Sequence, residues 1–498
     1  MSINKKRFKY GSMATAVTVV VIVLVVLLNV VVAQLGKRTN LSLDMTPGKT
    51  FEITQETKDY LATIDQPVKI VVMADEQVFA SGSVYYKQAY EILKKYVIWS
   101  DNISLEFVNM TKDPTYVNRY SEIYKGSIDE GDIVIEANNK IRVTSAIDLF
   151  NIETDYSTYY TTGQPTMTVV SSKAEQVFTS NIMYVTDANP MTACIFTTDS
   201  ATQSISYYEN MFNDNGYDVV SCDPLTEAIP EEADIIVMIA PLNDYPEEVI
   251  KKLYTFLDNG GQLGKNLIYI ADYEQKPTPN IDAFLAEWGI KVGNGVVYDT
   301  NTENLTSIGG TIPAIYTAEI NENYSAKLAQ PSLSVVVPLS RPVDVLFETK
   351  DTRSTEVILS SYDTGYVVSE EMLTEDGRLD ESQIVEKSYD LMVMGRKFVW
   401  NENNEQIYSN VLAVGSSMML DEYLTQLSYI NNGELFVEAV NTMTGKENGI
   451  TIVPKDFTSK TFERTDKELA VNLIVFIVLI PVAIIITCIV VCVKRRNR

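Results

Sequence analysis

Apolar residues in the middle of the chain follow a strand–helix–strand pattern. Residues 235–240 and 267–271 are continuous apolar runs, which is typical of strands covered on both faces. Between these runs, the apolar residues from Val249 to Leu257 recur at helical spacing and therefore share one face of a helix. Two strands joined by a helix in this way are expected to be parallel, with a right-handed connection.

The ends of this central helix carry their own signals. Asp244 is suited to cap the helix and Pro246 to occupy its first position. Gly260 and Gly261 follow the helix and are expected to end it. A GxGxxG phosphate loop would open a helix instead, so these glycines do not indicate a dinucleotide site, and we expect no cofactor.

Similar patterns on both sides extend the unit into a domain. Apolar strands are predicted at residues 192–196, 217–222 and 295–298. Helices with apolar faces are predicted at residues 205–212 and 281–288. Together they predict a doubly wound parallel sheet of about five strands, a Rossmann-like α/β domain over residues 191–300.

An earlier segment, residues 67–150, has the element order of a thioredoxin-like α/β module. Its pattern predicts a strand at 68–73, a helix at 85–99, a strand at 103–109, a helix at 115–124 and a hairpin of 132–136 with 140–144. Asn138 and Asn139 are a favourable pair for the hairpin turn. A redox thioredoxin would carry CxxC after its first strand, where this chain has Met73-Ala74-Asp75-Glu76. We therefore expect a binding or spacer module.

The remaining segments are less regular. Residues 34–66 read as a linker with a short helix capped by Thr54, and residues 151–190 as an exposed loop up to 167 followed by a helix at 174–185. Residues 301–460 read as a β-rich extension, with strands at 333–338, 391–400 and 407–415, a helix at 434–443, and an acidic stretch at 369–383 expected to be disordered. The run at 412–415 is positioned to return to the central sheet.

Both ends of the chain carry a long uncharged apolar run. Residues 13–33 span roughly 30 Å as a helix, the thickness of a bilayer core, and follow a basic segment at residues 1–12. Residues 469–493 form a second run, followed by a basic tail at 494–498. The positive flanks predict two transmembrane helices in a cell membrane, with both termini cytoplasmic and the main domain extracytoplasmic. The alternative for residues 13–33 is a cleaved signal peptide ending near Ala33, although the run is longer than a usual signal core.

The amino-acid composition excludes several classes of partner and site. The 498 residues include 66 acidic and 40 basic residues, a formal net charge of −26, so we expect no nucleic-acid partner. Histidine is absent, which excludes a histidine base and histidine metal ligands. Cys194 and Cys222 are isolated from each other in sequence and are expected to be buried free thiols, unless adjacent strands bring them close enough to pair.

The chain resembles the auxiliary components of ABC-type transport systems, the family named after the gliding-motility protein GldG. The resemblance rests on the order of several stretches between two terminal apolar segments. These are LDMTPGK at 43–49, PVKI at 67–70, EQVFTSNI at 175–182, the helix–Gly-Gly–strand–Asp form at 256–272, and the closing strand and helix at 413–415 and 432–441. It implies an extracytoplasmic α/β protein working beside an ABC permease and a cytoplasmic ATPase. The absence of GxxxxGK[ST] agrees with a subunit that is not itself an ATPase.

Two turns depart from that family. Relatives often carry a Gly-His-Gly-Glu-like turn after the first strand of the central domain, where this chain has Thr197-Thr198-Asp199-Ser200-Ala201. Relatives also tend to have an acidic residue after the glycine of the closing strand, where this chain has Gly415-Ser416-Ser417. Both departures weigh against catalysis or metal binding at these turns.

Candidate site residues follow from the fold class. Ligands of open α/β sheets bind beyond the carboxyl ends of the strands, which here carry Thr198, Asp199, Asn243 and Asp272. The alternative is that these residues only cap helices or turns. The sequence thus favours a non-enzymatic membrane-anchored ABC auxiliary subunit, with the bilayer contacted through residues 13–33 and 469–493. Two alternatives remain, a free-standing surface module that binds a carbohydrate or cell-wall polymer, and a hydrolase using a pair of carboxylates.

Overall fold

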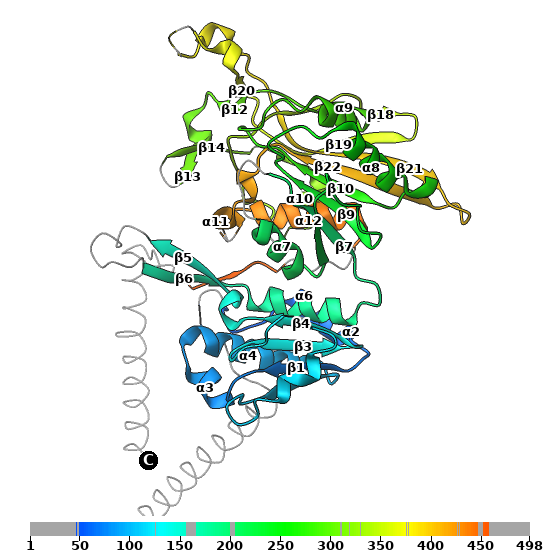
Figure 1. Cartoon of the computed structure of the whole chain (residues 1–498). Helices are drawn as coiled ribbons and strands as arrows, with labels where there is room; N and C mark the ends of the chain where they lie inside the picture. Colours follow the sequence, from blue (N-terminus) through cyan, green and yellow to red (C-terminus); the bar gives the residue numbers. More distant parts are fainter. Residues whose placement is uncertain are drawn as a thin grey trace, which may run out of the picture. The chain divides into compact units, whose positions relative to one another are not determined.

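The protein is a mixed α/β protein with several sheets, as the computed structural model in Figure 1 shows. The structure describes residue 46 and residues 49–124, 126–155, 166–199, 205–308, 311–317, 319–328, 330–374, 376, 378–425, 427, 429–446 and 452–457. These residues fall within one compact unit that ends at Phe457. Within these residues no helix is both long and apolar enough to cross a membrane, and the two predicted transmembrane segments lie outside them.

The first part of the unit is a four-stranded sheet in the order β2-β1-β3-β4. β1 and β2 are parallel, whereas β3 is antiparallel to both β1 and β4. Asn138 and Asn139 form the β3–β4 turn with positive φ angles of 50° and 61°, as the hairpin prediction requires. The elements of this module are α2 (Gln55–Thr63), β1 (Val68–Val72), α3 (Glu76–Ser81), α4 (Val84–Trp99), β2 (Ile103–Phe107), η1 (Tyr116–Tyr120), β3 (Ile133–Ala137), β4 (Lys140–Thr144) and η2 (Ala146–Leu149).

One prediction in this module needs correction. The helix expected at 115–124 is only a short 3₁₀ helix, η1, because residues 115–121 are mostly Thr, Tyr, Val, Asn and Ser, which have low helix propensity. After β1, where a redox thioredoxin would carry CxxC, Asp75 caps a short helix, α3, by accepting a hydrogen bond from the backbone amide of Gln77. By contrast, the predicted cap of α2 by Thr54 is confirmed.

The exposed loop predicted at 151–167 is wrong at both of its ends. β5 (Phe150–Asp155) and β6 (Thr166–Ser172) pair as an antiparallel ribbon, and β23 (Lys455–Asp456) adds to the other side of β6. The Thr, Tyr and Gly content suggested a loop, but Thr and Tyr are also common in strands. The predicted helix after the ribbon is present as α6 (Ala174–Thr186).

The second sheet has nine strands, and five of them are parallel neighbours in the order β22-β10-β9-β7-β8. β21, β19 and β15 continue the sheet on the β22 side as antiparallel strands, and β18 pairs with β19. The strands are β7 (Thr192–Phe196), β8 (Asp218–Cys222), β9 (Ala233–Ile239), β10 (Asn266–Ile270), β15 (Glu319–Ile320), β18 (Thr349–Lys350), β19 (Arg353–Ser360), β21 (Asp390–Trp400) and β22 (Gln406–Val414).

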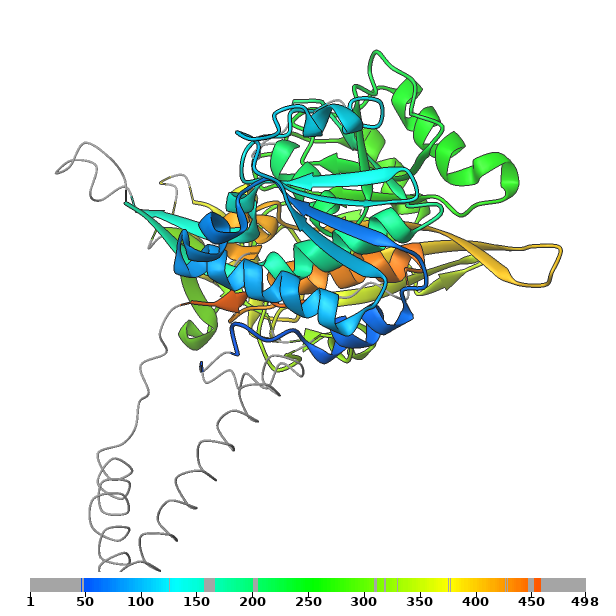
Figure 2. The same ribbon diagram turned by 90° about the horizontal axis from the view of Figure 1, so that it is seen from below.

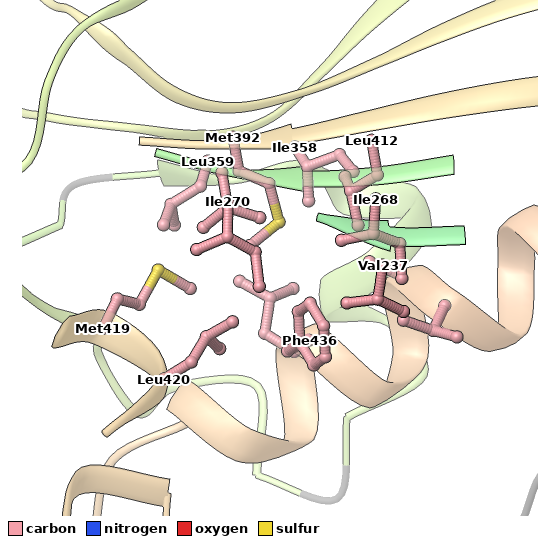
Figure 3. Close-up of a cluster of buried hydrophobic side chains, with 14 of the residues drawn as sticks. Val237, Ile268, Ile270, Ile358, Leu359, Met392, Leu412, Met419, Leu420 and Phe436 are labelled. Carbon is pink, nitrogen blue, oxygen red and sulfur yellow. The ribbon is translucent and has the colours of Figure 1, made fainter. Parts of the chain in front are cut away.

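Helices cover both faces of this sheet. α7 (Ile205–Asp214) and α12 (Asn432–Thr444) pack on one face, and α8 (Glu247–Asp258) and α9 (Pro279–Glu287) pack on the other. Figure 3 shows the first of these cores, where Phe436 of α12 points toward Val237 and Ile268 of the sheet. Alternate residues of each buried strand therefore serve two different cores, which explains the continuous apolar runs in the sequence.

The membership of the parallel sheet differs from the prediction at one strand. The strand predicted at 295–298 exists as β12 (Val296–Asp299), but it pairs with β20 (Gly365–Val368) in a separate two-stranded sheet. The fifth parallel strand is β22, which pairs with β10 as the prediction for residues 412–415 anticipated. Gly293 and Gly295 turn the chain away from the central sheet before β12 begins, and Gly295 has a φ of 86°.

The start of α8 also differs from the prediction. Pro246 is the cap residue and not the first helical residue, and it offers no side-chain hydrogen bond. The Asp244 carboxylate instead accepts hydrogen bonds from the backbone amides of Asn280 and Ile281 at the start of α9. Asp244 thus caps the next helix in the chain, a choice that only the tertiary structure reveals.

The remaining elements are small sheets and short helices. β11 (Ile290–Val292) pairs with β17 (Val343–Val345), and β13 (Leu305–Ile308), β14 (Ile312–Tyr316) and β16 (Val336–Pro338) form a three-stranded sheet. Short helices are η4 (Asn259–Gly261), η5 (Thr302–Asn304), α10 (Glu322–Ser325), η8 (Met418–Leu420) and α11 (Glu422–Thr425). The acidic stretch expected to be disordered contains two 3₁₀ turns, η6 (Glu370–Met372) and η7 (Glu381–Gln383). Figure 2 shows the ends of β21 and β22 projecting as a two-stranded ribbon.

Candidate functional site

The four predicted site residues all follow the carboxyl ends of the parallel strands, but they do not converge on one ligand position. The Thr198 hydroxyl lies 2.7 Å from the Tyr245 hydroxyl, and the Asp199 carbonyl accepts a hydrogen bond from the Leu242 amide. Asn243 Oδ1 accepts a hydrogen bond from Lys276 Nζ at 3.1 Å. These contacts tie the loops to one another, and they favour the structural reading of the residues.

Asp272 is the centre of a buried network at this edge. Its side chain is 1% exposed and accepts hydrogen bonds from the Ser417 hydroxyl at 2.5 Å and the Glu274 amide at 2.8 Å. Gln275 Oε1 accepts a hydrogen bond from the Asp272 amide, and Gln275 Nε2 donates one to the Pro241 carbonyl. The network therefore joins the loops after β9, β10 and β22.

The network also involves Gly415-Ser416-Ser417, the turn that follows β22. A side chain on Gly415 would place its Cβ 2.3 Å from the Arg341 carbonyl oxygen, so only glycine fits there. Ser416 donates to the Pro338 carbonyl, and Ser417 donates to Asp272. Chemically, the Ser417–Asp272 pair lacks the imidazole base that a serine nucleophile uses in a catalytic triad, because the chain has no histidine.

We expect Asp272→Ala to lower the free energy of unfolding by about 1–3 kcal/mol, because the buried Ser417 hydroxyl loses its acceptor and the Glu274 amide loses a second hydrogen bond. Urea denaturation of the full chain measures the change. Asp199→Ala is the matched control, since Asp199 is exposed and accepts the hydrogen bond from the Leu242 amide through its backbone carbonyl. Equal losses in the two variants would contradict a buried structural role for Asp272.

Cys194 and Cys222 are buried free thiols, as predicted, on the adjacent strands β7 and β8. Their sulfur atoms lie 3.3 Å apart. The hydrogen bond with Cys222 and burial both raise the pKa of Cys194, so this thiol stays protonated and is a poor nucleophile. Among the described residues, no group of three or more cysteine, aspartate or glutamate side chains is placed to hold a metal ion.

A cleft of about 700 Å³ lies where the N-terminal module and the β5–β6 ribbon meet α7 and α12. We call it the junction cleft. Its wall combines charged, amide and aromatic side chains, among them Arg142, Lys173, Tyr184, Asn210, Asp214 and Gln330. Burial raises the pKa of Asp148, a further lining carboxyl group. Neither the cleft nor these residues stood out in the sequence, because the wall comes from segments that are far apart in the chain.

Three basic side chains converge beside the cleft on the carboxyl end of α7. Arg142 stacks on the Tyr184 ring at 3.7 Å and donates to Asn213 Oδ1 at 3.0 Å and the Tyr217 carbonyl at 2.6 Å. Lys173 pairs with Asp214 at 2.7 Å.

Lys446 is the third, and it donates to the Asn215 carbonyl at 2.8 Å. A helix end with free carbonyl groups favours cations, so these contacts join the module, α7 and the end of α12.

Burial lowers the pKa of Lys446 to about 8. In the unfolded chain a lysine has a pKa of about 10.4. Below pH 8 the lysine is charged in both states, and its burial lowers the free energy of unfolding by the full amount. As the pH rises above 8 the buried lysine loses its proton and this destabilisation is relieved. We expect the free energy of unfolding to gain about 2 kcal/mol from this group between pH 7 and pH 9.5.

Lys446→Met should lack this gain, which urea denaturation at several pH values measures. Lys276→Met, which removes a lysine whose contact is exposed, should keep it. Identical pH profiles for the wild type and Lys446→Met would contradict the burial argument.

Comparison with known proteins covers only part of the chain. Residues 47–149 match a family described as a domain of unknown function, DUF7088. This match begins before α2 and ends with η2, so it spans the whole N-terminal module.

No curated protein matches the sequence. A solved structure of PurLQS from Thermotoga maritima is 10% identical and covers 51% of this chain and 99% of its own, but its TM-score of 0.26 carries no argument about fold or function.

Proposed function

We propose that this protein is a non-enzymatic, membrane-anchored auxiliary subunit of a bacterial ABC transport system, with an ectodomain that recognises a partner or substrate. The observation that carries the proposal is the position of the two ends of the described unit. Thr54 near its start and Lys455 near its end both contact Glu175. Neighbouring ends suit a domain that is held by one anchor at each end of its chain.

The non-enzymatic part of the proposal rests on the strand ends. Asp272, the most buried of the four candidate residues, uses its carboxylate oxygens to hold the chain's own hydroxyl and amide groups. Thr198 and Asn243 likewise contact neighbouring loops. An α/β enzyme would keep polar groups at this edge available to its substrate.

The proposal includes the finer fold assignments. We take the module with the sheet order β2-β1-β3-β4 as thioredoxin-like. We take the sheet with helices on both faces as a Rossmann-like, doubly wound domain with a β-rich extension. The junction cleft between them is then the place where we expect a partner or substrate to bind.

Purification of the tagged full chain from native membranes in mild detergent tests the proposal. We expect an ABC permease and its ATPase to co-purify with the chain. The control has residues 49–457 replaced by an unrelated soluble domain between the same terminal segments, and it should not retain them. Absence of both subunits from the full-chain sample would overturn the proposal.

The alternative, a free-standing module for a carbohydrate or cell-wall polymer, is favoured by one feature. Phe398, Trp400 and Tyr408 form an aromatic cluster on the projecting β21–β22 ribbon, with ring centroids about 6 Å apart and Trp400 58% exposed. Sedimentation with purified cell-wall polymer that is lost in Trp400→Ala would support this function instead. Absence of sedimentation of the wild-type chain would count against it.

A further inference from the structure

The carboxylate of Glu175 lies at a point where three distant segments meet. Glu175 lies in the first turn of α6 and is 2% exposed, and its Oε1 accepts hydrogen bonds from the Thr54 amide at 2.6 Å and the Thr57 hydroxyl at 2.7 Å. Its Oε2 lies 2.6 Å from Lys455 Nζ. Among the described residues Oε2 has no hydrogen-bond donor, so its contact with Lys455 is an ion pair. The two oxygens of one carboxylate thus hold the two ends of the described unit.

The C-terminal segment, which we call the strap (Ile452–Phe457), is held by further contacts. Lys455 Nζ donates to the Glu52 carbonyl, and the Phe457 amide donates to the Val170 carbonyl at 2.9 Å. The Phe457 ring packs on Tyr85 and Phe150, with centroids 5.0 and 6.3 Å away.

Gln88 forms a second polar link close to the strap. Gln88 donates to the Thr50 carbonyl and accepts from the hydroxyl of Ser172, the strand partner of Lys455. Gln88 therefore joins the N-terminal segment to the strand that pairs with the strap.

The strap also forms part of the junction cleft. Ile452, Val453 and Pro454 line the cleft immediately before Lys455. Phe150 and Lys173, from the ribbon and the start of α6, line the same cavity. A displacement of the strap would therefore change the shape of the cleft wall.

We propose that Glu175 and Lys455 form a latch that couples the N-terminal segment Thr50–Thr57 to the strap, so that release of either one loosens the other and opens the wall of the junction cleft. The coupling is reciprocal, because each segment stabilises the charged carboxylate that the other needs. A buried ion pair suits this role, since removal of one partner leaves a buried charge without compensation.

Hydrogen exchange of the full chain in detergent tests the latch, with Lys455→Gln as the variant. Exchange should accelerate roughly tenfold at the Phe457 amide and equally at the Thr54 amide, which bonds to the opposite carboxylate oxygen. The amides of β1 and β3 should keep their wild-type exchange, which shows that the module stays folded. Lys455→Arg, which retains the charge, should restore protection at both ends.

A second variant tests the coupling in the opposite direction. Thr57→Val removes a hydrogen bond to Glu175 from the other end, and it should accelerate exchange at Phe457. Lys327→Gln, which breaks a Lys–Glu pair with Glu438 at 2.8 Å, is the matched control and should change neither Thr54 nor Phe457. Acceleration confined to the mutated end in both variants would overturn the coupling.

Discussion

Replacement of Phe436 by alanine is expected to lower the free energy of unfolding by about 3–5 kcal/mol. Phe436 is 1% exposed and projects from α12 into the core beneath the central sheet. Its neighbours come from strands that are themselves fully buried, among them Val237, Ile268 and Leu412. Such strands cannot move into the cavity that the alanine leaves, so most of the free-energy cost of the cavity remains.

Urea denaturation followed by tryptophan fluorescence and circular dichroism measures this loss. Trp400→Ala is the control, because it deletes an even larger aromatic side chain from a position that is 58% exposed. The loss in the free energy of unfolding of this control, measured by circular dichroism, should stay below about 1 kcal/mol. A loss of that small size in Phe436→Ala would contradict the packing of α12 against the sheet.

Glu175→Ala is expected to lower the free energy of unfolding by about 3–5 kcal/mol. The substitution leaves Lys455, whose side chain is 12% exposed, without the carboxylate that balances its charge. It also removes the acceptor of the Thr54 amide and the Thr57 hydroxyl. The cost follows from burial, since Thr57 is fully buried and Lys455 is largely buried.

Glu438→Ala is the matched test of that reasoning. Glu438 is nearly as buried and also pairs with a lysine, but its partner Lys327 is 52% exposed and can return to solvent. We expect a loss of about 1 kcal/mol or less for Glu438→Ala. Thermal denaturation of both variants compares them, and a larger loss for Glu438→Ala would refute the view that partner burial sets the cost.

Much of the fold could be predicted from periodicity. The central strand–helix–strand unit, the β3–β4 hairpin and the strand at residues 407–415 depend on local patterns, and the structure contains all three. The placement of β12 could not be predicted, because an apolar run does not specify which sheet it joins. The same limit applies to Asp244, which is near α8 in sequence but caps α9 in space.

The candidate sites were less accessible to sequence reasoning. The position of Asp272 at a strand end followed from the fold class, but its partner Ser417 lies 145 residues later. The stretch EQVFTSNI belongs to a predicted helix and to the family resemblance, but neither indicates the role of its Glu175 at the junction of three segments. The Glu175–Lys455 ion pair and the junction cleft depend on long-range contacts, which no local pattern encodes.

The order of strands in the central sheet has a consequence for synthesis. β22 pairs with β10 across a separation of 144 residues, as the Asn266–Asn410 contact shows. Contacts between residues so far apart in the chain form slowly, and the N-terminal module can fold earlier because its partners are made first. Until residue 414 has been translated, β10 presents an open apolar edge. A chain terminated before β22 would therefore expose a strand able to pair with other chains, so premature termination should yield aggregates instead of a smaller folded protein.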